Sequence, residues 1–353
     1  MPRLAALAAA CAVAVACLLP PSAAQGPADE VSRRLSRWEA EPALRPFATL
    51  TPPGVGLTAP TGQRMSLHIG VNRLDPAKYP GVPSLEAAEA DALALHDTAR
   101  LALFEAKLLV GERATTRAVL AEFAAAAARL RAGDLFLVTF AGHGALVKDF
   151  NNNHAPRGYD QAFCLYDRML VDDEIVTRWA DFKPGVKVLI LLDSCHSGTS
   201  KTARARGQTA ARSAKALAPG KDAVAKLVAR SVGGSATPRV RALPTDEHAQ
   251  ANAVQESELI AATKGLDSVA AVARTQAAVL RIAACRADQE SLEVGRHGLF
   301  THSLLELWDG GRFPGTYRDL VARAGALTSP YQEPTLDYYG EEVVSFLANP
   351  SFR

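Results

Sequence analysis

Short apolar runs alternate with amphipathic stretches along the chain from residue 66 onward. The runs are rich in Val, Ile and Leu, which is typical of buried strands, and the stretches between them repeat apolar residues every three or four positions, which is typical of helices. Strands are predicted at 66–72, 106–111, 134–142, 186–193 and 278–285, with a short final strand near 335–340. Helices are predicted at 85–103, 116–131, from 172, and near 256–274, 299–308 and 316–327. This alternation favours an α/β fold with a three-layer, doubly wound, mostly parallel sheet.

Residues 199–250 interrupt the alternation. They consist mainly of Ala, Arg, Lys, Ser and Gly without an aromatic residue, and we expect a basic, flexible and exposed insertion. The insertion separates a first half, residues 64–198, from a second half, residues 251–353. Residues 25–63 are rich in Pro, Gly and Ala and are interpreted as a linker or an N-terminal arm.

Residues 1–24 have the pattern of a secretory signal peptide. Arg3 precedes an apolar run from Leu4 to Leu19, and small residues follow at 22–24. The run is short for a stable membrane span, so we expect a cleaved signal, an exported protein and no span after cleavage. An uncleaved anchor and lipoprotein processing at Cys17 are the alternatives.

Composition limits the class of partner. The chain has 353 residues, 48% of them hydrophobic and 22% charged, which is typical of a globular protein. The net charge of +2 combines a charge of +9 in residues 199–241 with −7 in the remainder. This uneven distribution argues against a generally basic nucleic-acid binder.

The cysteine count indicates a thiol with a function. After removal of the signal the chain keeps Cys164, Cys195 and Cys285, an odd number, so at least one thiol stays unpaired. Cys164 and Cys285 lie in apolar, strand-like segments and are expected to be buried. The sequence does not decide whether they form a disulfide with each other. An unpaired thiol in an exported protein suggests use in chemistry.

Two glycine-flanked loops follow the most apolar strands. The third strand ends in Ala-Gly-His143-Gly144, and the fourth in Asp-Ser-Cys195-His-Ser-Gly. Carboxyl ends of parallel strands share one edge of the sheet, where ligands bind. If these two strands are neighbours, imidazole and thiol lie side by side, and the imidazole can take the thiol proton to leave a nucleophilic thiolate. His196 is an alternative base, although adjacent side chains normally point in different directions.

These two loops together resemble those of the caspase/metacaspase family of cysteine peptidases. Weaker likenesses are LEAAEADA at 85–92, ACRADQESLE with GLFTHSLLELW at 284–308, and YQEPTL at 331–336. The resemblance implies a caspase-hemoglobinase-like fold and a cysteine endopeptidase that works through a thioester. It also implies that His143 is the general base and acid, that Cys195 is the nucleophile, and that the Gly144 and Cys195 N–H groups form the oxyanion hole.

Two carboxylates match substrate-binding positions of metacaspases. By this resemblance Asp91 and Asp193 line an acidic pocket, which predicts cleavage after Arg or Lys because a buried cation needs a paired anion. A capping role for Asp193 and a solvated helix face for Asp91 are the alternatives.

Three further carboxylates, Asp160, Asp172 and Asp173, resemble a metacaspase calcium site. Carboxylates are suitable ligands for this hard cation. The alternative is that Asp172 and Asp173 cap a helix N-terminus. No cofactor is expected to be required for the chemistry itself.

Other functions remain consistent with the same motifs. A catalytically inactive module that binds proteins or peptides is one, and a transpeptidase that uses the same thioester is another. For a peptidase the partners are protein or peptide substrates. The basic segment 199–241 is either a solvated linker or a site of self-cleavage beside the nucleophile.

Overall fold

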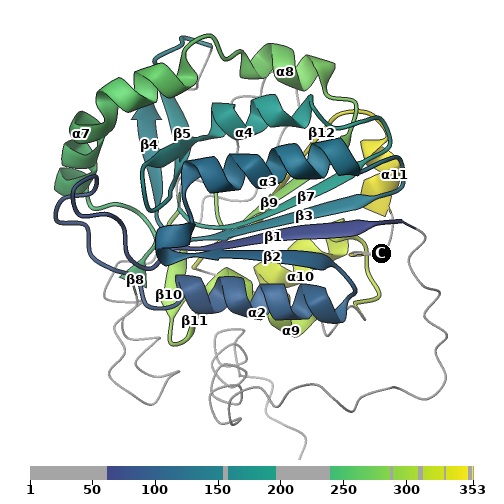
Figure 1. The fold of residues 1–353 in the computed structure, drawn as a ribbon. Coiled ribbons are helices and arrows are strands. Elements are labelled where there is room, and N and C mark those ends of the chain that lie inside the picture. Colours follow the sequence, from purple (N-terminus) through teal and green to yellow (C-terminus); the bar gives the residue numbers. More distant parts are fainter. Residues whose placement is uncertain are drawn as a thin grey trace, which may run out of the picture.

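A six-stranded sheet crosses the centre of the molecule, with helices on both faces (Figure 1). The structure is a computed structural model and describes residues 62–153, 158–195, 239–286, 289–308, 313–329, 331–348 and 352. The strand order is β12-β9-β7-β3-β1-β2. The strands are β1 (Arg64–Gly70), β2 (Glu105–Val110), β3 (Leu135–Ala141), β7 (Lys187–Asp193), β9 (Ala278–Ala283) and β12 (Thr335–Tyr339).

The topology confirms the predicted doubly wound fold. In this sheet β1, β2, β3, β7 and β9 are parallel to one another, and β12 runs antiparallel to its neighbour β9. Strand order reverses at β1, because β2 lies on one side of it and β3 on the other. The carboxyl ends near such a reversal form the crevice where α/β proteins bind ligands.

The two faces of the sheet bury separate apolar cores. Helices α3 (Thr116–Arg129) and α4 (Asp172–Trp179) cover one face, where Phe123 and Trp179 are buried. Helices α2 (Ala88–Leu101), α9 (Leu299–Trp308) and α10 (Tyr317–Thr328) cover the other, and α11 (Val343–Ala348) packs beside β9. The nearly continuous burial of β3 and β7 follows from this double covering.

Two small sheets lie beyond the carboxyl edge of the main sheet. One joins β4 (Gly144–Lys148), β5 (Tyr159–Cys164) and β6 (Met169–Val171), and the other joins β8 (Arg239–Val240), β10 (Leu292–Val294) and β11 (His297–Gly298). Helix α7 (Thr245–Thr263) packs on the first of these sheets, and α8 (Ser268–Arg274) packs against α4. A short 3-10 helix, η1 (Gly111–Arg113), connects β2 to α3.

Some predicted elements differ from the observed ones. The helix expected at 256–274 is two helices, because Gly265 adopts a φ of 75° and Asp267 caps a new helix by accepting from the Ala270 N–H at 2.8 Å. Strand β4, which pairs antiparallel with β5, is not among the predicted strands.

The prediction of an exposed insertion at 199–250 is wrong for the C-terminal end of that range. Arg241 and Leu243 are buried, and α7 begins at Thr245. Residues 199–238 lie outside the described residues, as do the predicted signal at 1–24 and residues 25–61 of the arm predicted at 25–63. Within the described chain, helices long and apolar enough to span a membrane are absent.

All three cysteines of the described chain are free thiols. Cys164 lies in β5, Cys285 follows β9, and both are buried, as expected, without a disulfide between them. Burial raises the pKa of the Cys164 thiol, so it stays protonated. A packing role fits this inert environment.

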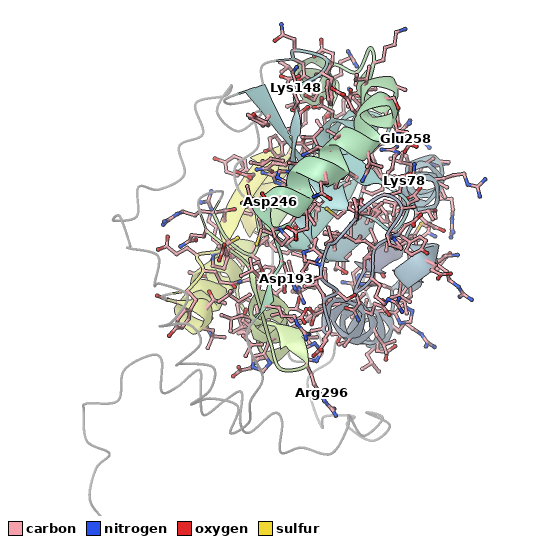
Figure 2. The ribbon with its side chains drawn as sticks, turned by 90° about the vertical axis from the view of Figure 1, so that its left-hand side faces the viewer. Lys78, Lys148, Asp193, Asp246, Glu258 and Arg296 are labelled. Atoms are coloured by element: carbon pink, nitrogen blue, oxygen red, sulfur yellow. The ribbon has the colours of Figure 1, made fainter. Side chains whose placement is uncertain are left out.

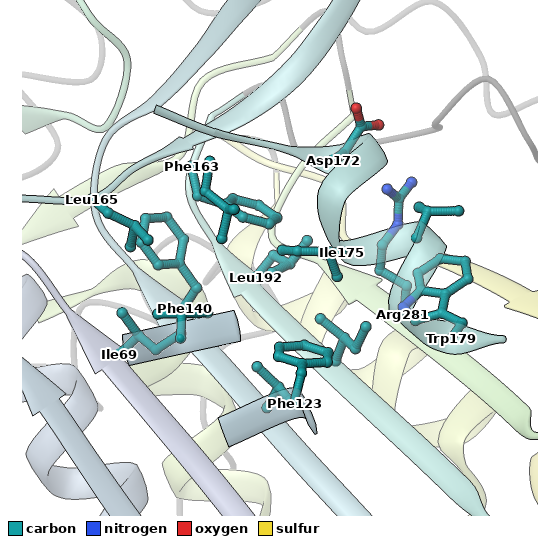
Figure 3. Close-up of a pocket in the computed structure, with 15 residues that line it drawn as sticks. Ile69, Phe123, Phe140, Phe163, Leu165, Asp172, Ile175, Trp179, Leu192 and Arg281 are labelled. Atoms are coloured by element: carbon teal, nitrogen blue, oxygen red, sulfur yellow. The ribbon is translucent and has the colours of Figure 1, made fainter. Parts of the chain in front are cut away.

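A small apolar cavity lies between the sheet and helices α3 and α4 (Figure 3). Its volume is about 20 Å³, and aliphatic and aromatic side chains form most of the wall, with Asp172 and Arg281 on one side. This volume holds about one water molecule. The cavity is therefore a packing defect of the core and not a ligand site.

A buried histidine links the stability of the fold to pH. His68 on β1 lies between the hydroxyl oxygens of Ser66 and Thr139, each 2.9 Å from a ring nitrogen. Burial lowers its pKa to about 3, so the ring is neutral in the folded chain. In the unfolded chain the ring is protonated below pH about 6.5, and folding then requires loss of that proton.

We therefore expect the free energy of unfolding to fall as the pH drops from 7.5 to 5. The stability associated with His68 is fully present above pH about 6.5 and is lost as the pH falls toward its folded pKa. Between these two pH values the loss from His68 is about 2 kcal/mol. Urea denaturation at both pH values measures it, and His68→Asn should reduce the acid-induced loss by a similar amount. An identical pH dependence in the variant would contradict a neutral buried ring.

Candidate active site

His143 and Cys195 lie at the carboxyl ends of neighbouring parallel strands. Ala141, the last residue of β3, pairs with Asp193, the last residue of β7, and each motif residue follows two positions later. Neighbouring strands are about 4.8 Å apart. The structure thus gives these strands the adjacency on which the predicted Cys–His site depends.

The imidazole of His143 is buried and neutral. Its Nε2 lies 3.0 Å from the carbonyl oxygen of Pro83. A carbonyl only accepts, so Nε2 carries the proton and Nδ1 keeps its lone pair. Nδ1 makes no hydrogen bond in the described part of the chain. Burial lowers the pKa of His143 to about 4, and the Pro83 hydrogen bond opposes this shift.

The thiol of Cys195 is held by the backbone of Ser291. The Ser291 N–H donates to Sγ at 3.0 Å, and the Ser291 carbonyl lies 3.6 Å from Sγ as an acceptor for the thiol proton. Burial raises the pKa of the Cys195 thiol well above its ordinary value, although the Ser291 N–H favours the thiolate. In this form the thiol of Cys195 and the imidazole of His143 are both neutral.

The carbonyl oxygen of Arg241 lies between two backbone donors. It accepts from the Gly144 N–H at 2.9 Å and from the Cys195 N–H at 3.2 Å. These are the two N–H groups that the sequence predicted as the oxyanion hole. A Cβ on residue 144 would lie 1.9 Å from the Cys195 carbonyl oxygen, so only glycine permits this close approach.

The guanidinium of Arg241 occupies an acidic pocket directly below this carbonyl. Its terminal nitrogens lie 2.5 Å from Asp91 Oδ2 and 3.1 Å from Asp193 Oδ2, and the side chains of all three residues are at most 3% exposed. Glu293 contributes a third carboxylate, 3.6 Å from the same guanidinium. Burial alone would lower the pKa of Arg241, but the carboxylates outweigh it and raise the pKa.

Asp91 comes from α2 and is fixed by the second half of the chain. Its Oδ1 lies 2.5 Å from His297 Nδ1, and its Oδ2 accepts from the Gly298 N–H at 3.0 Å. A Cβ at residue 298 would come within 2.5 Å of both Asp193 and Arg241, so a glycine shapes the pocket wall. Asp91 is therefore buried, unlike the solvated helix position considered as its alternative.

Asp193 ends β7, and both of its carboxylate oxygens accept hydrogen bonds. Its Oδ1 accepts from the Ser291 hydroxyl at 2.6 Å, and its Oδ2 accepts from the Thr301 N–H and hydroxyl at 2.9 and 2.7 Å. These donors hold the carboxylate in place with or without a cation in the pocket. Figure 2 shows Asp193 among the packed elements, whereas Lys148 and Arg296 lie at the periphery.

Sequence reasoning missed several residues of this site. Ser291, Glu293, Gly298 and Thr301 lie in segments that resembled the family, but no role was assigned to them, because their contacts with Asp91 and Asp193 join distant parts of the chain. Arg241 was grouped with the exposed basic insertion, since charge alone does not distinguish a buried arginine from a solvated one. His196 lies outside the described residues.

The three predicted metal-binding carboxylates form one cluster, where β5 and the start of α4 meet. Asp160 of β5 and Asp172 and Asp173 of α4 are buried, and one ligand oxygen from each lies within 4.8 Å of the others. Asp173 also accepts from the side-chain amides of Asn151 and Asn153, at 2.7 and 2.8 Å. Three buried oxygen ligands at this separation fit a calcium ion.

Comparison with known proteins agrees with this geometry. The chain is 38% identical over 73 residues to "Metacaspase-1" of Arabidopsis thaliana, which covers 19% of this chain and 20% of that protein. The chain thus aligns with about a fifth of the length of this curated relative. The solved structure of protein GSU0716 from Geobacter sulfurreducens is similar with a TM-score of 0.63 and 31% identity, over 82% of this chain and 98% of that one.

The family match covers most of the described structure. It extends over residues 67–335 and includes both halves of the chain, from β1 to the first residue of β12. Both motif loops, Asp91 and Arg241 fall inside it. The chain therefore belongs to the caspase-domain family of peptidases, Peptidase C14.

Proposed function

We propose that this protein is a cysteine endopeptidase that cleaves peptide bonds after Arg or Lys, with Cys195 as nucleophile and His143 as base. The observation that carries the proposal is Arg241. Its carbonyl is held by two N–H donors next to the thiol, and its guanidinium is held by Asp91 and Asp193. A substrate residue on the N-terminal side of the cleaved bond would need to bind with its carbonyl and its side chain in these same two positions.

Formation of the thioester requires a proton to move first. His143 takes the Cys195 proton at Nδ1, and the thiolate sulfur attacks the substrate carbonyl carbon. The negative charge that develops on the oxygen is stabilised by the Gly144 and Cys195 N–H groups, which already point at this position. The imidazolium then donates its proton to the leaving amine as the C–N bond breaks.

Hydrolysis of the thioester repeats these roles. His143 takes a proton from water, the resulting hydroxide attacks the carbonyl carbon, and the C–S bond breaks. The imidazolium returns its proton to the Cys195 sulfur, and the released carboxylic acid loses its proton to solvent. The Pro83 carbonyl keeps the Nε2 proton in place throughout, so Nδ1 is the exchanging atom.

The geometry of the pocket favours arginine over lysine. One guanidinium nitrogen reaches Asp91, and another reaches both the carboxylate and the carbonyl of Asp193, each at 3.1 Å. A lysine ammonium is a single point and does not span both acids in this forked manner.

The chain's own Arg241–Ala242 bond is the first substrate under this proposal. The neutral thiol and the occupied pocket describe a latent form, in which cleavage at this bond frees the pocket. The uncleaved chain would then resemble the inactive binding module, and failure to cleave any peptide would favour that alternative.

We further propose that calcium binds at Asp160, Asp172 and Asp173. The support is geometric: one oxygen from each of the three buried carboxylates lies within 4.8 Å of the others, and carboxylate oxygens suit a hard divalent cation. The ion would supply charge neutralisation and fix the start of α4. Export through residues 1–24 also remains part of the proposal, supported by the signal pattern alone.

The purified wild-type chain should cut itself into two fragments, with the new N-terminus at Ala242. Cys195→Ala should stay intact, and His143→Ala should slow the cut by about a thousandfold, because general base catalysis is lost. Mass spectrometry of both fragments over time measures this, with circular dichroism to check folding. Cleavage by the Cys195→Ala protein at the wild-type rate would refute the nucleophile assignment.

We expect fluorogenic peptides that differ only in the residue before the cleaved bond to be cut efficiently after Arg, less efficiently after Lys, and not after Asp. Asp91→Asn and Asp193→Asn should each lower kcat/KM for the Arg peptide by about a hundredfold or more, since one buried cation loses a partner. Unchanged Arg preference in both variants, or preferential cleavage after Asp, would exclude the acidic pocket.

Calcium at millimolar concentration should raise the Tm of the Cys195→Ala chain by several degrees, since ligand binding to the folded state alone stabilises it. Asp160→Asn should remove most of this increase, whereas Asp246→Asn, an exposed acid on α7, should retain it. Equal increases in the two variants would contradict the site.

A further inference from the structure

The segment around Arg241 is bound along the cleft as an added strand. Val240 and Arg239 of β8 pair antiparallel with Leu292 and Glu293 of β10, and the Arg241 N–H donates to the Ser291 carbonyl at 3.0 Å. Beyond the Arg241 carbonyl, the Leu243 N–H donates to the Gly144 carbonyl at 3.4 Å. Backbone pairing on both sides of one carbonyl fixes the register of every side chain in this segment.

Alternation along the strand places Arg239 on the same side as Arg241. The Arg239 guanidinium lies 2.5 Å from Glu86 Oε1 and 3.8 Å from Glu293 Oε1. Glu293 is nearly fully buried, and its other oxygen is the one that faces Arg241 at 3.6 Å. One glutamate thus lies between the two arginines.

Glu86 and Glu293 are held together by the fold. The Glu86 N–H donates to Glu293 Oε1 at 2.7 Å, although Glu86 belongs to the turn before α2 and Glu293 to β10. Glu86 itself is 70% exposed, so its carboxylate is open to an incoming side chain. These acids form a second anionic position next to the pocket of Asp91 and Asp193.

We infer that the cleft recognises two basic side chains, one and three residues before the cut, with Glu86 and Glu293 binding the outer one. This rests on the proposed peptidase function and names its substrate class: an extended peptide with the pattern basic-x-basic. Arg239-Val240-Arg241 is such a peptide within the chain. Val240 lies on the other side of the strand and packs against Leu292, Val294 and Leu299, so the middle residue takes no part in the selection for charge.

The contribution of the outer position is smaller than that of the inner one. Arg239 is 40% exposed and its ion pair with Glu86 is screened by water, whereas Arg241 is fully buried. We expect peptides with Arg three residues before the cut to be cleaved about fivefold faster than those with Ala there, in line with one exposed ion pair. Glu at that position should be worse than Ala, because it faces Glu86 and Glu293.

The test compares Arg-Val-Arg, Ala-Val-Arg and Glu-Val-Arg coumarin amides on the wild-type chain. Glu86→Gln should remove most of the preference for Arg-Val-Arg over Ala-Val-Arg. Glu86→Arg should invert the order, so that Glu-Val-Arg becomes the better substrate. Glu258→Gln, a surface glutamate paired with Lys78 on another face, is the matched control and should behave as wild type (Figure 2).

Self-cleavage supplies an independent readout. Arg239→Ala should slow the cut after Arg241 by a few-fold, and combining it with Glu86→Gln should add little further, since both remove the same contact. Equal rates for Arg-Val-Arg and Ala-Val-Arg on a chain that cleaves after Arg would overturn this inference alone. Failure to cleave any of the three amides, together with absence of self-cleavage, would overturn the proposed function and the inference with it.

Discussion

The burial of one positive charge organises the edge of the sheet. Arg241 is inaccessible to solvent, and a lone cation in such a place would be strongly unfavourable, so the surrounding carboxylates are a physical requirement. Asp91 and Asp193 come from the first half of the chain, and Glu293 comes from the second. The same cation therefore holds the two halves together at the cleft, and it does so only while the segment from 239 to 243 stays in place.

The carboxylates do not depend on the cation for their positions. Ser291 and Thr301 donate to Asp193, and Gly298 donates to Asp91. A pocket held by its own hydrogen bonds is preorganised, so removal of Arg241 would leave an anionic site of the same shape for another basic side chain. Under the proposed function, the hydrogen-bonded carboxylates would therefore select a basic side chain, and the segment from 239 to 243 would only supply the one that fills the pocket.

Chemistry and latency follow from the same burial. The occupied cleft excludes water from Cys195 and His143, which raises the pKa of the thiol and lowers that of the imidazole. Both shifts favour the neutral pair over the thiolate and imidazolium. Opening of the cleft to water would relieve both pKa shifts and favour the thiolate that the proposed reaction needs.

Local patterns were sufficient for the elements of the main sheet. The apolar runs predicted the ends of β1, β2, β3, β7 and β9 to within about two residues. They could do so because a strand buried on both faces is hydrophobic throughout. Alternation of these runs with amphipathic helices was enough for the doubly wound fold. The short strands β4, β6, β8, β10 and β11 were missed, since strands of two to five residues carry too little periodicity.

The sequence by itself was enough to select the residues of the proposed site. Glycine-flanked loops after two apolar strands pointed to His143 and Cys195, and the family resemblance pointed to Asp91 and Asp193. Tertiary structure alone decided that Arg241 enters the pocket, that Glu293 faces two arginines, and that Ser291 holds the thiol. The reason is physical: a residue's charge is fixed by its side chain, but its burial and its partner depend on chain segments folded against it from 48 to 150 positions away.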